Sequence, residues 1–269
     1  MIEQLSVGDA SLYLTQVERG ISPLRDNYGL HVGDDATLVL ERRHALAKHI
    51  GRPIVWMDQT HSADVALVRH DGGNTPAVRS RVQVTLGQTD SFLSERDPHL
   101  WPQLPCDGVV VDARSWPQAP AVAVMTADCM PIIFSADKGR VVAGIHAGRI
   151  GFTTGIILHT LEIFASLGLS AREISVYIAP AICGQCYEVP VEMQRELAQL
   201  MPKIAGATRW GTPSLDLPKA AAAQLHAAGC EHVTIDARCT LEDQQWHSHR
   251  RDPRSGRYVS LVVPTWENA

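Results

Sequence analysis

Two histidines and one cysteine stand where the sequence predicts loops beside buried strands. His61 closes the polar segment 58–61 after an apolar run, Cys129 lies between two apolar runs, and His146 ends another. Imidazole nitrogen and thiolate sulfur are preferred ligands of Zn²⁺, and three protein ligands leave a fourth position for water or substrate. The three residues therefore predict a catalytic zinc site, with copper as the alternative metal. Ordinary packing stays the alternative for each residue taken alone, since the chain has 12 histidines and buried cysteines are common.

The same residues also allow thiol chemistry. Cys129 would then be a nucleophile and His146 or His61 its base, which makes a thiol hydrolase a further hypothesis. Asp128, next to Cys129, is a candidate to orient a ligand or to move a proton. A multicopper oxidase needs several copper ions and therefore many histidines in paired motifs. This sequence is less compatible with such an enzyme, because His-x-His occurs only at 247–249.

Positive charge gathers in two places that could receive a phosphate. Gly148–Gly151 lies at a predicted helix start and contains Arg149, and free backbone N–H groups at such a start attract anions. The segment 247–257 is basic and contains Arg250, so it is either a phosphate clamp or a solvated hairpin loop. No phosphate-binding loop of the common nucleotide-binding kinds occurs.

A second pair of thiols is harder to interpret. Cys183 and Cys186 form a single C-x-x-C, which fits half of a zinc site, a redox pair or coincidence. Without a second pair nearby, we interpret them as packed or incidental cysteines.

The apolar pattern predicts the elements that must position these residues. Continuous runs predict buried strands, and apolar residues at helical spacing predict helices. The expected strands are 53–57, 62–68, 109–111, 122–126, 131–134, 141–145, 174–179, 233–236 and 258–263. The expected helices are 35–50, 151–167, 191–201 and 216–229. Partial alternation of the two predicts an α/β or α+β fold with mixed sheets flanked by helices.

One long connection interrupts this pattern. Residues 69–106 contain scattered glycines and prolines, and an unstructured stretch of this length is unusual inside a domain. We interpret it as an elaborated connection with a hairpin at 82–86. Residues 1–269 are therefore expected to form a single domain.

Composition excludes several classes of protein. The chain has 269 residues, 45% of them hydrophobic, and a formal net charge of −5, which indicates a globular protein and argues against a nucleic-acid or acidic-membrane partner. No apolar stretch is long enough to cross a membrane, and the N-terminus lacks the layout of a secretory signal. We expect a cytoplasmic monomer.

Several short motifs together resemble the YfiH-type laccase-domain family, in the same order along nearly the whole chain. The resemblance rests on Gln59-Thr60-His61, Thr126-Ala127-Asp128-Cys129, His146-Ala147-Gly148, Ala179-Pro180-Ala181-Ile182, Cys186-Tyr187-Glu188-Val189 and Arg250-Arg251-Asp252. Segments 27–29 and 32–35 resemble the family's N-terminal motif.

This resemblance implies a fold, a metal and an activity. The family fold is a single α/β domain, and its metal ligands correspond to His61, Cys129 and His146 here. Its members are described as zinc-dependent purine nucleoside phosphorylases that act on adenosine, inosine and methylthioadenosine and also deaminate adenosine. Purine nucleoside and phosphate are thus the expected small-molecule partners. Other descriptions are copper-dependent polyphenol oxidase and peptidoglycan editing factor. For such a reaction we further expect Arg149 or Arg250 to bind phosphate, and Asp128 and Cys129 to be catalytic residues.

The chain also departs from the family pattern. Ser62 replaces the usual glycine, His249 replaces a tyrosine, and 146–151 reads His-Ala-Gly-Arg-Ile-Gly where the family has His-Ala-Gly-Trp-Arg-Gly. The N-terminal motif at 17–21 is also degraded. These departures make a diverged, non-catalytic metal-binding protein a further alternative.

Overall fold

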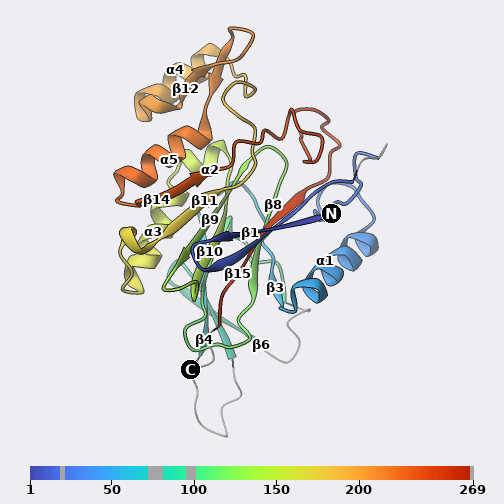
Figure 1. Ribbon diagram of the computed structural model, residues 1–269, viewed down its shortest axis with the longest axis vertical. Helices are drawn as coiled ribbons and strands as arrows, with labels where there is room; N and C mark the ends of the chain where they lie inside the picture. The colour runs from blue at the N-terminus through green and yellow to red at the C-terminus, as the bar shows by residue number, and fades with distance from the viewer. Residues whose placement is uncertain (19–21, 72–80, 95–100, 267–269) are drawn as a thin grey trace, which may run out of the picture.

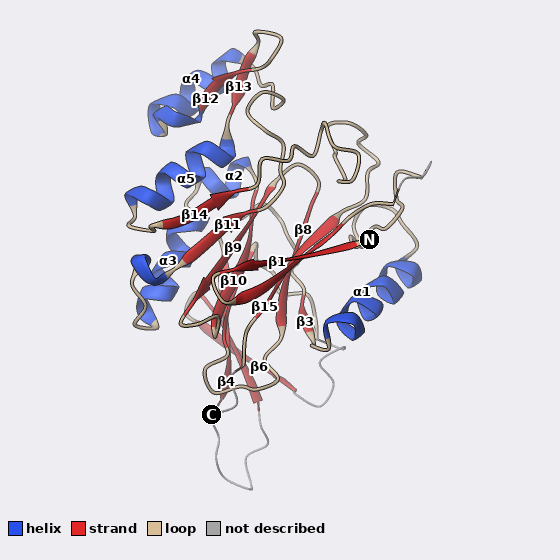
Figure 2. Ribbon diagram, viewed as in Figure 1, coloured by secondary structure: helices blue, strands red, loops and turns tan. Residues whose placement is uncertain are grey.

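Four layers build the protein, in the order helix, sheet, sheet, helix (Figures 1 and 2). The structure is a computed structural model and describes residues 1–18, 22–71, 81–94 and 101–266. One apolar core fills the space between the two sheets, and a further core lies between each sheet and its helices. The predicted class, an α/β fold with mixed sheets flanked by helices, is confirmed.

The smaller sheet has five strands and is covered on its outer face by one helix. Its spatial order is β1 (Ile2–Val7), β2 (Ala10–Thr15), β15 (Tyr258–Val263), β8 (Ala121–Thr126) and β3 (Ile54–Val55). All neighbours are antiparallel except β3 and β8. Helix α1 (Ala36–Ile50) begins where the Asp35 side chain accepts a hydrogen bond from the Thr37 N–H, and it packs Leu46 against Val259 and Leu261.

The larger sheet has eight strands and supports the site. Its order is β14 (His232–Ile235), β11 (Ser175–Ile178), β9 (Met130–Ala136), β10 (Val141–Ala147), β7 (Gly108–Asp112), β4 (Val65–Asp71), β5 (Arg81–Leu86) and β6 (Thr89–Ser94). Its central strands β9 and β10 are buried along their whole length, as their continuous apolar runs predicted.

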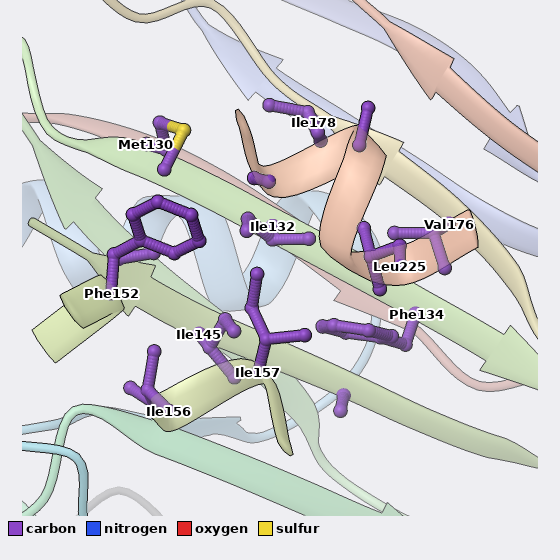
Figure 3. Close-up of a cluster of buried hydrophobic side chains, with 14 of the residues drawn as sticks. Met130, Ile132, Phe134, Ile145, Phe152, Ile156, Ile157, Val176, Ile178 and Leu225 are labelled. Atoms are coloured by element: carbon purple, nitrogen blue, oxygen red, sulfur yellow. The ribbon is translucent and has the colours of Figure 1, made fainter. Parts of the chain in front are cut away.

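Helices α2 (Arg149–Thr153), α3 (Ile156–Ser166) and α5 (Leu217–Ala227) cover the outer face of the larger sheet. Figure 3 shows Ile156 and Ile157 of α3 beside Ile145 of β10, and Phe152 of α2 in the same apolar cluster. The prediction of one helix over 151–167 was wrong in its bounds. The helical segment begins at Arg149 and breaks at Gly155, whose φ of 105° lies in the left-handed region that favours glycine.

The remaining elements form a small extension at one end of the molecule (Figure 1). They are helix α4 (Val191–Leu200), the short helix η3 (Pro202–Ile204), and the paired strands β12 (Ala205–Ala207) and β13 (Pro213–Leu215). The short helix η2 (Ala171–Glu173) lies apart from them, against α3. Helix α4 contacts this strand pair and η3, which in turn contacts α5.

The connection at 69–106 contains a hairpin over 81–94, which is larger than the one predicted at 82–86, because 82–86 lies within its first strand. Strands β5 and β6 pair in antiparallel register with Leu86 opposite Thr89, and β5 also pairs with β4. Residues 72–80 and 95–100 of this connection, and residues 19–21 of the N-terminal motif, lie outside the described residues. The expected strand at 53–57 is reduced to Ile54–Val55, and the strand expected from Ser62 begins at Val65. Among the described residues, no helix has the length and apolar character that crossing a membrane requires.

Candidate metal centre and active site

The three predicted ligands meet at one end of the seam between the two sheets. Residues 127–129 lead from β8 in the smaller sheet to β9 in the larger one, and this connection carries Cys129. The connection from β3 to β4 also changes sheet, and it carries His61. His146 lies near the end of β10, beside β9. The site is therefore formed by two connections between the sheets and one strand end, all of them anchored to the packed core.

The geometry of the three side chains suits one metal ion. Their ligand atoms all lie within 4.8 Å of one another, and the Cys129 Sγ is 3.7 Å from the His61 Nε2. The two imidazole rings are 4.6 Å apart at an angle of 71°. His146 is buried, Cys129 half-buried and His61 exposed, so the site is open on the side of His61.

Asp107, which the sequence analysis did not select, holds two of these ligands. Its buried carboxylate lies 2.7 Å from the His146 Nδ1, which leaves the His146 Nε2 facing Cys129. The same carboxylate accepts hydrogen bonds from the backbone N–H groups of Thr60, His61 and Ser62, at 2.7–3.1 Å. A carboxylate behind a metal-binding histidine orients its ring and raises its basicity.

The loop of His61 is fixed on its other side by Gln59. The Gln59 amide donates to the Met125 carbonyl at 2.8 Å and accepts from the Met125 N–H at 2.9 Å, which attaches the loop to the end of β8. His61 has a φ of 66° and Asp128 a φ of 88°. Such conformations are costly for residues other than glycine and persist where surrounding contacts impose them, often at functional sites.

The glycines of the segment 146–151 make room for this loop. A Cβ on Gly148 would lie 2.6 Å from the His61 Cδ2 and 3.2 Å from the Cys129 Sγ. A Cβ on Gly151 would lie 2.5 Å from the Ser62 carbonyl oxygen. The spacing of these two glycines therefore serves close packing against the ligand loop.

Charges at the site favour ligation by thiolate. Burial alone would raise the pKa of the Cys129 thiol, but the charge of His146 and hydrogen bonds from His146 and His61 lower this pKa to about 6. Burial would lower the pKa of His146, but Cys129 and Asp107 raise it to about 9. Burial alone would raise the pKa of Asp107, but its hydrogen bonds with His146 and Ser62 have the larger effect and lower this pKa. Both shifts act in the direction of a thiolate at Cys129 and a proton on His146, and a metal ion would take the place of that proton.

Two hollows meet at Cys129. One, of about 190 Å³, is lined by Asp128, Cys129, Arg149, Tyr187 and Arg250, among others. The other, of about 220 Å³, is lined by both histidine ligands and by His31, His249 and Arg257, among others. The predicted phosphate residues Arg149 and Arg250 thus lie in the wall of the first hollow, and Arg257 adds a cation to the second.

Asp128 and Arg250 are joined within this wall. The Asp128 carboxylate accepts from the Thr240 hydroxyl at 2.6 Å and from the Arg250 backbone N–H at 2.7 Å. The Arg250 guanidinium lies 5.2 Å above the Tyr187 ring and donates to the Glu188 carbonyl. The solvated loop that was one of the two alternatives for 247–257 is found in part, since 249–251 and 253–254 are exposed. His247 and Ser248 are buried, however, and Arg250 lines the hollow, as the phosphate-clamp alternative requires.

The departures from the family pattern at Ser62, Arg149 and His249 lie at this site. The Ser62 N–H donates to Asp107, His249 lines both hollows, and Ile150 is exposed while Arg149 faces the first hollow. Asp107, Tyr187 and Arg257 were missed as site residues. The motif containing Tyr187 and the basic segment that ends at Arg257 were the available signals, whereas Asp107 had none.

The fold and the three convergent ligands define a four-layer α/β protein with a candidate metal centre. Residues 14–265 match the model of the family described as multi-copper polyphenol oxidoreductase laccase, and the chain belongs to this family. The resemblance to YfiH-type proteins is thereby confirmed.

Curated relatives cover most of the chain. Purine nucleoside phosphorylase Rv2149c of Mycobacterium tuberculosis is 36% identical over 239 residues, which are 88% of this chain and 83% of the relative. Purine nucleoside phosphorylase ORF3 of Streptomyces griseus is 35% identical over 239 residues, 88% of this chain and 85% of the relative.

Solved structures share the fold. YlmD from Geobacillus stearothermophilus is 28% identical with a TM-score of 0.77 and covers 97% of this chain and 93% of its own. Protein NMB0706 of Neisseria meningitidis, 24% identical, has a TM-score of 0.77 over 98% of this chain and 99% of its own. At 24% identity, the similarity to NMB0706 shows that the two proteins share a fold and nothing more.

Proposed function

We propose that the protein is a zinc-dependent purine nucleoside phosphorylase that acts on adenosine, inosine and methylthioadenosine. The observation that carries the proposal is the convergence of His61, Cys129 and His146 beside a hollow lined by Arg149 and Arg250. Relatives at 35–36% identity that are named purine nucleoside phosphorylase support the same activity.

The donor set fits zinc. Two imidazole nitrogens and one thiolate are suitable ligands, Asp107 orients one of them, and three ligands leave an open position. A zinc ion held there would supply a Lewis acid that polarises a phosphate or water oxygen.

The chain's own residues would bind the reactants and move the proton. Phosphorolysis breaks the bond between the ribose carbon and the purine nitrogen, forms a bond from that carbon to a phosphate oxygen, and leaves a proton to be placed on the purine. Arg149 or Arg250 would neutralise the phosphate, because guanidinium matches its geometry. Asp128, in the same wall, would handle the proton at the purine.

Deamination of adenosine is proposed as a second activity of the same site. Water would replace the exocyclic amine at the purine ring, releasing ammonia and forming inosine. This reaction needs no phosphate, so phosphate dependence separates it from phosphorolysis.

A thiol hydrolase is the second candidate, and one observation favours it. Cys129, His146 and Asp107 lie in the order nucleophile, base and orienting carboxylate, and the pKa of Cys129 is lowered to about 6. His61, 3.7 Å from the same sulfur, is the feature that this candidate does not use. It predicts activity that survives a metal chelator.

The test is adenosine turnover by metal-quantified protein, with and without phosphate, beside Cys129→Ala. Phosphate-dependent release of adenine by the zinc form, and none by Cys129→Ala, is the expected result. Inosine without adenine would reduce the proposal to deamination. Zinc-loaded protein that leaves adenosine, inosine and methylthioadenosine unchanged would refute both and favour a non-catalytic metal-binding role. Oxidation of a phenol only after copper loading would support the polyphenol oxidase alternative.

A further inference from the structure

A second group of metal-binding side chains lies on two turns behind the wall of the first hollow. Its ligand atoms belong to Cys183, Cys186, Cys239 and Glu242, and they all lie within 4.8 Å of one another. The structure thus places beside the C-x-x-C a third thiol that is 56 residues from Cys183 along the chain.

The two turns are built alike. The Cys186 N–H donates to the Cys183 carbonyl at 2.9 Å, and the Glu242 N–H donates to the Cys239 carbonyl at 3.1 Å. Each turn therefore offers its first and fourth residues as ligands. Pairs of ligands spaced as C-x-x-C are typical of structural zinc sites, in which two such segments close a tetrahedron.

We propose that Cys183, Cys186, Cys239 and Glu242 bind one Zn²⁺ ion as a structural site, separate from the centre at His61, Cys129 and His146. The set supplies four ligands from the chain and leaves no open position, which is the pattern of a structural site and not of a catalytic one.

The distances between the ligand atoms and the presence of three thiols favour a bound metal ion over a disulfide. Four ligands at ~2.3 Å from a tetrahedral zinc ion lie about 3.8 Å from one another, within the observed spread of the cluster. A disulfide would use two of the three thiols and leave the third beside Glu242. All three cysteines are free thiols in the structure, and the Cys186 Sγ is 3.4 Å from the Glu242 carboxylate.

The surroundings suit a negatively charged metal site. Three thiolates and a carboxylate around Zn²⁺ have a net charge of −2, and Arg209 lies beside them, in an ion pair with Glu242 and 3.4 Å from the Cys186 Sγ. The Cys183 backbone N–H donates to the Cys239 Sγ at 3.4 Å. Ile182, Cys186 and Cys239 are buried together, with Tyr187 and Leu241 packed against them. Such outer contacts orient and stabilise metal ligands.

The ion would join the two segments that form the wall of the first hollow. The first turn leads into Tyr187 and the second is followed by Arg250, and both of these residues line that hollow. Both segments also bind Asp128, because the Ile182 N–H donates to its carbonyl and the Thr240 hydroxyl to its carboxylate. We therefore expect loss of this ion to loosen the wall while the ligands of the first centre remain.

Zinc content of the purified full-length chain and its variants tests the proposal. We expect about two zinc ions per wild-type chain and about one each in Cys129→Ala and Cys239→Ser. The matched control is Cys230→Ser, a buried cysteine outside both clusters, which should keep the wild-type content. Zinc content in Cys239→Ser equal to the wild-type value would overturn the proposal.

X-ray absorption at the zinc edge of Cys129→Ala tests the ligands without altering the second site. A first shell dominated by sulfur at ~2.3 Å is expected. A shell of nitrogen and oxygen, iron in place of zinc, or a thiol titration showing a disulfide would each refute it. None of these outcomes depends on nucleoside turnover, so this proposal and the phosphorylase proposal fail separately.

Discussion

The Asp107 carboxylate lies 2.7 Å from the His146 Nδ1 and also accepts hydrogen bonds from three backbone N–H groups of the loop that carries His61. One buried side chain therefore orients the ring of one metal ligand and the backbone of another. Its lowered pKa, which its bonds with His146 and Ser62 maintain against burial, keeps it ionised for both tasks.

Replacing Asp107 by asparagine should weaken metal binding without removing a ligand. The amide keeps one acceptor oxygen but presents an NH₂ group where the carboxylate received N–H donors. We expect zinc affinity to fall ~10–100-fold, the usual effect of losing such a partner. Competition with a chromophoric chelator measures this affinity. Asp112→Asn, at the other end of β7 and paired with Arg114, is the control, and equal affinities in the two variants would contradict the role given to Asp107.

Adding one methyl group at Gly148 should disturb the site by contact alone. The φ of Gly148 is −67°, so alanine suits the backbone, but its Cβ would lie 2.6 Å from the His61 ring. His61 must move, and we expect zinc affinity to fall about tenfold, at the low end of the effect of misplacing a ligand. Calorimetric titration of zinc into Gly148→Ala tests this. Ile150→Ala, an exposed change in the same helix, should bind as the wild type does, and full affinity in Gly148→Ala would show that the loop adapts.

How far the sequence predicts this site depends on how local each signal is. His61, Cys129 and His146 could be selected because each follows or precedes a buried apolar run. The runs beside Cys129 and His146 fold as expected into β8, β9 and β10, and the run before His61 forms the shorter strand β3. Asp107 could not be selected in this way, because its hydrogen-bond partners lie 39 to 47 residues away in the sequence and its own segment contains no motif. The C-x-x-C of Cys183 and Cys186 was interpreted as incidental for the same reason.

The fold shows the same limit. Central strands were predicted because burial on both faces makes their apolar runs continuous. Strand β1 was not predicted, because it pairs at the edge of its sheet and most of its residues are exposed or half-buried. The break between α2 and α3 was missed because apolar spacing continues across Gly155, and only the backbone conformation of that glycine ends the first helix.

Replacement of Arg250 should weaken phosphate binding without affecting folding. Its guanidinium lines the hollow beside Cys129, held over the Tyr187 ring. Under the proposed phosphorylase activity, we expect Arg250→Ala to raise the KM for phosphate ~10–100-fold, the effect of one lost charge-assisted hydrogen bond of ~1.5–3 kcal/mol. Steady-state kinetics with varied phosphate measure it. Arg254→Ala, an exposed arginine of the same segment, is the control. An unchanged KM in Arg250→Ala, with a raised KM in Arg149→Ala, would assign the phosphate to Arg149 instead.

His247 should make the protein sensitive to mild acid. Burial lowers the pKa of this side chain to about 4, below the value of ~6.5 for an unfolded chain. Above pH ~6.5 neither state binds the proton, so His247 has no effect on stability there. As the pH falls from ~6.5 towards 4, the unfolded state binds a proton that the folded state does not, and the free energy of unfolding decreases by at most about 3 kcal/mol.

The variant His247→Asn isolates this effect from that of the carboxylates. Asparagine does not titrate, and it can replace the bond that the His247 Nδ1 makes with the Ser255 hydroxyl at 3.0 Å. We expect a shallower loss of stability between pH 6.5 and 4 than in the wild type, even if the smaller side chain lowers stability at neutral pH. Urea unfolding at several pH values measures the slope. His232→Asn, on the exposed strand β14, should leave the slope unchanged, and a wild-type slope in His247→Asn would show that other groups cause the acid sensitivity.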